Sequence, residues 1–118
     1  MELDLFIRNL TWESLRSETR EMTRHCVLDA LGCSLAGVEA DYFLALVRGI
    51  KGLDTGMESP VWGTELFMSL PWSIFLNSYT TAFFDMDDGH RLAQGHPGAA
   101  IIPAALCTAH YLDSSGKA

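Results

Sequence analysis

The run from Ser17 to Gly37 constrains the fold most, because its apolar residues recur at the spacing of one helix face. The apolar positions, at i, i+1, i+4, i+8 and i+11, are Val27, Leu28, Leu31, Leu35 and Val38. Small residues near the end of the run, Gly32, Cys33, Ala36 and Gly37, leave room for a neighbouring helix to approach closely. Gly37 is also placed where a helix commonly stops. The run therefore predicts a long helix whose C-terminal end is buried and closely packed.

Four further segments carry helix signals, and no segment shows the alternation of a strand. The signals are a short amphipathic run, a stripe after the capping residue Asp41, a proline in the first turn after Ser69, and an apolar run after Pro97. The stripe after Asp41 consists of Leu44, Val47 and Ile50. The predicted helices cover residues 3–10, 42–50, 71–84 and 98–112, and Pro103 predicts a late start or a kink in the last one. The predicted fold class is all-α.

Two details of this interpretation concern the segments between helices. Residues 51–63, with three glycines and a proline, predict a loop with a short extended piece at Val61 and Trp62.

Asp85 falls in one helical row with Ile74, Ser78 and Thr81, so we expect it at the C-terminal end of the fourth helix, among apolar neighbours. A carboxylate is unfavourable there with respect to the helix dipole, which suggests a role other than stability.

Composition narrows the classes of function. The chain has 118 residues, enough for one domain or less, and a formal net charge of -7. Its 8 lysines and arginines are scattered, which argues against nucleic-acid binding. The three cysteines lack CxxC spacing, so neither a disulfide framework nor a zinc knuckle is indicated. No basic signal-peptide start and no apolar run long enough for a bilayer are present, so we expect a cytoplasmic protein that does not bind membranes.

Ionisable residues concentrate in the segment FFDMDDGHRLAQGHPG, residues 83–98, which contains three aspartates, two histidines and an arginine. Three interpretations of this segment remain open. It could be a solvated loop whose polar side chains cap the neighbouring helices. It could be a metal site, because carboxylates and imidazoles are suitable ligands, although no EF-hand or HExxH pattern is present. The candidate ligands are Asp85, Asp87, Asp88, His90 and His96.

The third interpretation is an acid/base site. Carboxylates held close together raise one another's pKa, and a raised pKa suits proton transfer near neutral pH. His96, directly before Pro97 at the start of the last helix, is placed to donate a hydrogen bond to an anion that the free amides of that helix end also favour. Arg91 is a candidate for binding a carboxylate. This interpretation predicts proton transfer on an anionic substrate.

An ordered set of motifs resembles the N-terminal part of the MmgE/PrpD family. The set begins with LDALGCSLAG and VWG, continues with Asn77 and then FFDMDDGH, and ends with GHPGAAIIPAAL and SSGK at Lys117. The family includes 2-methylcitrate dehydratase, cis-aconitate decarboxylase and iminodisuccinate epimerase. The resemblance covers nearly the whole chain, and the Asp-x-Asp-Asp block followed by His-Pro is its most specific part.

The resemblance implies a large helical domain followed by a smaller α/β lid domain, in a homodimeric enzyme without metal or organic cofactor. Members remove a proton next to a carboxylate of a small di- or tricarboxylate, and then lose water, lose carbon dioxide or take the proton back. Carried over by position, Asp85 and His96 match active-site residues. Asp87 and Asp88 match the rest of the acidic block, where we expect them to orient the loop and, for Asp88, to contact the substrate.

The chain departs from the family pattern at three places, where it has Ser78, Ala82 and Gly89. The last two lack an imidazole and a hydroxyl that members usually carry, and His90 and Arg91 are the candidates to replace them in substrate binding. The exact substrate is therefore left open.

Family members are several times longer than this chain, so residues 1–118 are expected to form only the first part of the helical domain, and to be inactive alone. The alternatives are a non-catalytic helical remnant that binds a carboxylate or a protein, and a metal-binding hydrolase site.

Overall fold

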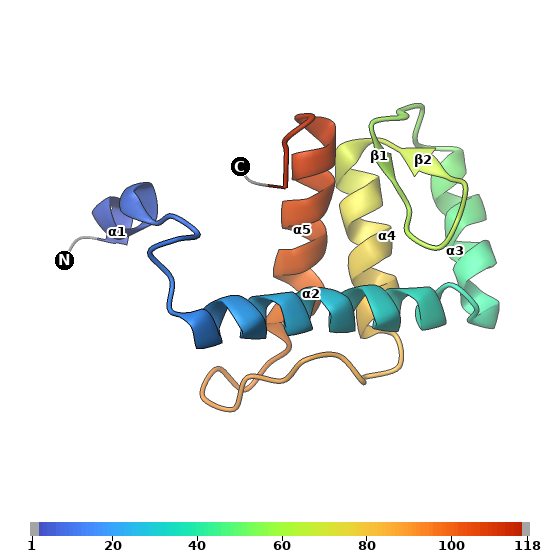
Figure 1. The fold of residues 1–118 in the computed structure, drawn as a ribbon. Helices are drawn as coiled ribbons and strands as arrows, with labels where there is room; N and C mark the ends of the chain where they lie inside the picture. Colours follow the sequence, from blue (N-terminus) through green and yellow to red (C-terminus); the bar gives the residue numbers. More distant parts are fainter. Residues whose placement is uncertain (1–2, 117–118) are drawn as a thin grey trace.

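The computed structural model describes residues 3–116 and is mostly helical (Figure 1). Its elements, in chain order, are α1 (Leu3–Asn9), α2 (Ser17–Gly37), α3 (Asp41–Lys51), β1 (Ser59–Pro60), β2 (Phe67–Met68), α4 (Leu70–Ala82) and α5 (Pro97–Tyr111). Each predicted helix is present, and the predicted bounds of the longest one are confirmed. Lys117, which closes the SSGK motif, lies outside the described residues. None of the described helices is by itself both long and apolar enough to cross a membrane.

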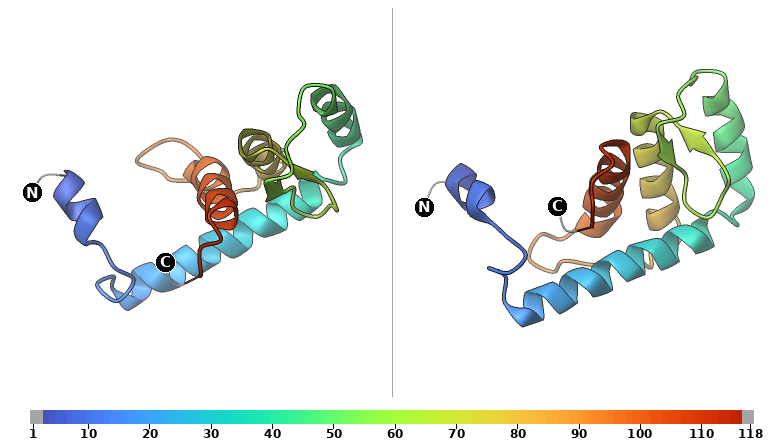
Figure 2. Two further views of the ribbon diagram at one scale, coloured as in Figure 1. Left: turned by 90° about the horizontal axis from the view of Figure 1, so that it is seen from above. Right: turned by 45° about the horizontal axis from the view of Figure 1, so that its top comes forward.

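Helices α4 and α5 lie side by side and run in opposite directions, and α2 crosses both of them (Figures 1 and 2). Buried hydroxyl groups connect α2 to α4. The Ser34 and Thr80 hydroxyl oxygens are 2.7 Å apart, and the Thr81 hydroxyl donates to the carbonyl oxygen of Ala30 at 3.3 Å. Because such groups are costly to bury without partners, these bonds fix how the two helices sit against each other.

The apolar core lies between α3, the β1–β2 hairpin and α4. It consists of Phe43, Val47, Ile50, Val61, Met68 and Leu76. The predicted stripe on α3 is therefore wrong at one position, because Phe43 is buried whereas Leu44 is 60% exposed. The spacing 43, 47 and 50 is i, i+4 and i+7, which is also a helical face. The packing of the hairpin and of α4 against this helix decides which of the two positions, 43 or 44, is buried.

The structure is mainly helical, in line with the all-α prediction, and adds one small β1–β2 hairpin that was not predicted. Its strands pair antiparallel, Ser59 with Met68 and Pro60 with Phe67, just before and after the predicted extended piece. The turn between them contains Gly63 at φ 73°, a left-handed conformation that glycine adopts without steric cost. Asn77 of α4 holds the hairpin, because it accepts a hydrogen bond from the amide of Trp62 at 2.9 Å and donates one to the carbonyl of Pro60 at 3.0 Å.

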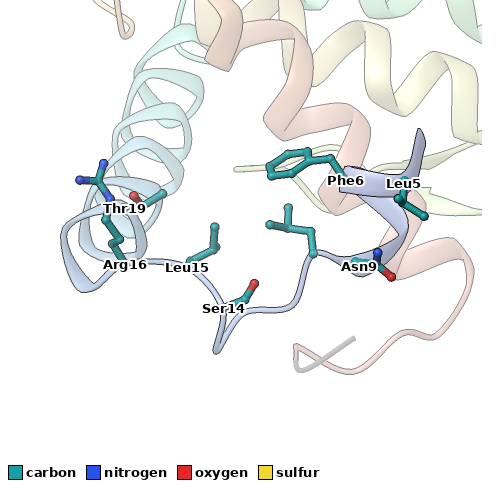
Figure 3. A pocket seen from close by; sticks show the side chains of 8 residues that line it. Leu5, Phe6, Asn9, Ser14, Leu15, Arg16 and Thr19 are labelled. Carbon is teal, nitrogen blue, oxygen red and sulfur yellow. The ribbon is translucent and has the colours of Figure 1, made fainter. Parts of the chain in front are cut away.

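Helix α1 stands apart from the other helices, and none of its residues is buried (Figures 1 and 2). An open hollow of about 450 Å³ separates it from the start of α2. Figure 3 shows Phe6 and Leu15 on opposite sides of this hollow, with Arg16 and Thr19 at its α2 side. The lining surface is mostly apolar and lies away from residues 83–98, which are called the acidic loop below.

Candidate functional site

The acidic loop connects the end of α4 to the start of α5, on the side of the bundle where α2 crosses (Figure 1). Helix α4 ends at Ala82, slightly before the predicted end at residue 84, and Asp85 follows just beyond its C-terminal end, where the amide of Asp85 donates to the carbonyl of Ala82 at 3.1 Å. Asp85 has φ 53°, in the left-handed region that terminates helices. Its side chain is 89% exposed, so the expected apolar surroundings are absent.

His96 lies between two carboxylates. Its Nε2 is 3.6 Å from Oδ1 of Asp85, and its Nδ1 is 3.2 Å from Oδ1 of Asp87. The imidazole is partly exposed, at 43% of its side-chain surface, whereas the Asp87 side chain is only 2% exposed. The structure therefore brings together the two predicted catalytic residues, Asp85 and His96, and adds a second acid, the buried Asp87.

The loop uses part of its own chemistry to hold this shape. The amide of His90 donates to the carbonyl of Gly95 at 2.9 Å, and the amide of Ala93 donates to Nδ1 of His90 at 3.0 Å. Gln94 closes the turn with φ 49°. One nitrogen of His90, a predicted substrate-binding group, is thus engaged by the loop itself.

Arg91 and Asp88, the other predicted substrate-binding residues, differ in their surroundings. Arg91 is exposed, and no carboxylate of residues 3–116 lies within ion-pair distance of it. The Asp88 carboxylate lies against the first turn of α5, so closely that a β carbon at Gly98 would overlap it. At this helix end a negative charge is favoured by the helix dipole. Asp88 therefore occupies the place where an external anion was expected.

Helix α2 contributes residues that sequence reasoning missed. Burial, followed by the negative charges of Asp29, Asp87 and Asp88, raises the pKa of the Cys33 thiol above its ordinary value. A shallow hollow of about 310 Å³ between α2 and the loop is lined by His25, Cys26, Asp29, Met86 and Asp88. The only sequence signal was that positions 29 and 33 share a helix face, and nothing indicated that the loop covers it.

His96 and the two aspartates beside it are also the candidates for holding a metal ion. One ligand atom from each of Asp85, Asp87 and His96 lies within 4.8 Å of the others. However, the imidazole presents a different nitrogen to each carboxylate, whereas one ion binds only one nitrogen of a histidine. The arrangement suits an imidazole that exchanges protons with its flanking acids better than it suits a metal centre.

Comparison with known proteins supports one family. No curated protein and no solved structure matches the chain significantly. The sequence model of the MmgE/PrpD N-terminal domain matches residues 2–118, which confirms the resemblance carried by the acidic block and the His-Pro motif. The chain belongs to the MmgE/PrpD family and corresponds to the N-terminal domain of that family.

Proposed function

We propose that this chain supplies part of the active site of a lyase or isomerase that removes a proton next to a carboxylate of a small di- or tricarboxylate. The observation that carries the proposal is the contact of Asp85 and His96 across the loop, with 3.6 Å between Oδ1 and Nε2. Both groups are exposed, so a small molecule can reach them. They come from the two ends of the loop, which the antiparallel pair α4 and α5 brings together.

The chemistry needs two things from such a pair. A carbon-bound proton next to a carboxylate is weakly acidic, so a positioned base is required, and its pKa must lie near the operating pH. Histidine fits because its unperturbed pKa is about 6.5. A second acid or base beside it then handles the proton of a leaving hydroxyl group or returns the proton to carbon. A positioned group of this kind contributes about 10²–10⁴-fold in rate.

Substrate binding needs positive charge, and the loop offers little. Arg91 is its only arginine or lysine, and three aspartates lie within seven residues of it. We therefore propose that Arg91 binds one carboxylate of the substrate and that groups outside residues 83–98 bind the other. We also propose that the protein forms a homodimer, as the family resemblance implies, and that the second subunit is one source of these carboxylate-binding groups.

The test follows proton removal directly. Because residues 1–118 are expected to be inactive alone, they are joined to the remaining part of a family enzyme, and the joined protein is incubated in D₂O with 2-methylcitrate, cis-aconitate or iminodisuccinate. Proton NMR then follows both deuterium incorporation and product formation. We expect exchange or turnover with one of them, and a loss of at least about 100-fold in Asp85→Asn and in His96→Asn. Glu65→Gln, an exposed change on the hairpin, is the matched control and is expected to keep the activity.

Two outcomes contradict the proposal. Activity that survives in both loop variants would place the chemistry elsewhere. Binding of these compounds without exchange or turnover, seen as shifts of the His96 resonances, would favour the alternative of a carboxylate-binding module.

A further inference from the structure

We propose that Asp87 is a positioning residue, which holds the imidazole of His96 through Nδ1 so that the lone pair of Nε2 points toward Asp85 and solvent. This inference rests on the proposed function, because it assigns the base of that reaction to one nitrogen atom. The sequence predicted for Asp87 a role in orienting the loop and, in the alternative interpretation, a role as a metal ligand.

The burial of Asp87 is the first part of the argument. A carboxylate with 2% of its side chain exposed loses its hydration, which is unfavourable unless a partner compensates. Among the described residues, His96 is the only group within ion-pair distance of Asp87, and Oδ2 of Asp87 has no hydrogen-bond partner. The carboxylate is therefore not part of a larger hydrogen-bond network, and His96 is the group available to compensate it.

The two nitrogens of His96 are the second part. A neutral imidazole carries one N–H, and the tautomer depends on which acceptor needs that proton more. Asp85 is 89% exposed and keeps its water, whereas the Asp87 side chain is only 2% exposed and has lost most of its hydration. The proton therefore stays on Nδ1, which faces Asp87 at 3.2 Å, and Nε2 keeps its lone pair.

A serine protease triad shows the consequence of this arrangement in general terms. There a buried aspartate holds a histidine in the tautomer that leaves Nε2 free to act as base, and replacing the aspartate by asparagine leaves the geometry but gives the wrong tautomer. In the present chain, an asparagine at position 87 could donate its amide N–H to Nδ1 and so move the imidazole proton to Nε2. The base would then be blocked at the atom that faces Asp85.

The experiment is nitrogen NMR of the whole chain labelled with ¹⁵N-histidine, at a pH high enough that His96 is neutral. We expect the Nδ1–H tautomer for His96 in the unchanged chain, the Nε2–H tautomer in Asp87→Asn, and a fall of about 10²–10⁴-fold in any exchange activity of that variant. Asp88→Asn changes the neighbouring carboxylate and is expected to leave the His96 tautomer as it was.

The result that overturns the inference is the Nε2–H tautomer of His96 in the unchanged chain, a measurement that needs no variant to fold. An Asp87→Asn variant that melts as a folded protein and keeps Nδ1–H would overturn it as well. The two proposals fail separately. Nδ1–H without turnover of any polycarboxylate contradicts the proposed function alone, and turnover with Nε2–H contradicts the role of Asp87 alone.

Discussion

Gly37 of α2 lies directly against the backbone of Thr80 in α4. A β carbon at Gly37 would be 2.7 Å from the carbonyl carbon of Thr80, closer than real β carbons approach other atoms. The contact is between backbone and backbone, so no flexible side chain can move aside. This closeness also brings Ser34, one turn earlier on α2, to within hydrogen-bond distance of the Thr80 hydroxyl.

Gly37→Ala is therefore expected to destabilise the chain by about 1–3 kcal/mol, because an extra methyl group in a closely packed contact forces the helices apart. The free energy of unfolding in urea, followed by circular dichroism, measures this. Gly32→Ala is the matched control, since nothing lies within 4 Å of its β position. It replaces a glycine inside a helix and is expected to stabilise the chain by about 0.5–1 kcal/mol. Equal effects of the two changes would refute the contact.

Asn77 gives the second prediction. Besides its bonds to Trp62 and Pro60, its amide donates to the sulfur of Cys107 at 3.2 Å, and the side chain is fully buried. Asn77→Ala leaves a partly buried amide, of Trp62, and a partly buried carbonyl, of Pro60, without this partner, and a fully buried group in that state would cost about 1–3 kcal/mol. We expect a loss of at least about 2 kcal/mol of unfolding free energy in urea. Ser78→Ala, the next residue on the helix, is the control, and a similar loss there would contradict the prediction.

The helices could be predicted because their signals are local. Apolar spacing and small residues gave the bounds of α2, and the close approach expected at Gly37 is confirmed by its contact with Thr80. The hairpin could not be predicted, because each strand has two residues and depends on Asn77, which lies on a later helix. The choice of Phe43 over Leu44 as the buried residue depends on that hairpin too.

The acidic loop shows the same limit. Its composition and the His-Pro motif identified Asp85 and His96, and the structure places them together. Which of three nearby aspartates is buried depends on how the loop lies over α2, and residue type carries no information on this. The sequence therefore placed Asp85 in apolar surroundings, whereas Asp87 is the buried acid.

Asp54 leads to a prediction on pH. Burial of its carboxylate opposes ionisation, but hydrogen bonds from the backbone and side chain of Ser69 and from the amides of Gly56 and Thr55 outweigh it, so the pKa of Asp54 lies below its ordinary value. A lowered pKa in the folded state means that Asp54 stabilises the fold above the unfolded pKa of about 3.9. This contribution is lost as the pH falls through the lowered value.

The measurement compares the unchanged chain with Asp54→Asn in urea at several pH values. We expect the unchanged chain to be more stable at pH 7, and the difference to shrink as the pH falls below about 4. The change Asp4→Asn on the exposed helix α1 serves as control and is expected to show no such pH dependence. A difference that stays constant down to pH 2 would contradict the role of ionised Asp54.

Cys33 reports on the electrostatics of the site from the α2 side. Burial and then the charges of Asp29, Asp87 and Asp88 raise the pKa of its thiol, so little thiolate forms at pH 8. Alkylation by iodoacetamide needs the thiolate and is therefore expected to be slow.

Asp29→Asn removes one of these charges and is expected to speed alkylation of Cys33, followed peptide by peptide in a mass spectrometer. High salt should speed it in the unchanged chain and reduce the gap between the two, because salt screens charge but not burial. Asp4→Asn, on the distant helix α1, should change nothing (Figure 1). If Asp29→Asn leaves the alkylation rate unaltered, the charge of Asp29 does not raise the pKa of Cys33, and the prediction is wrong.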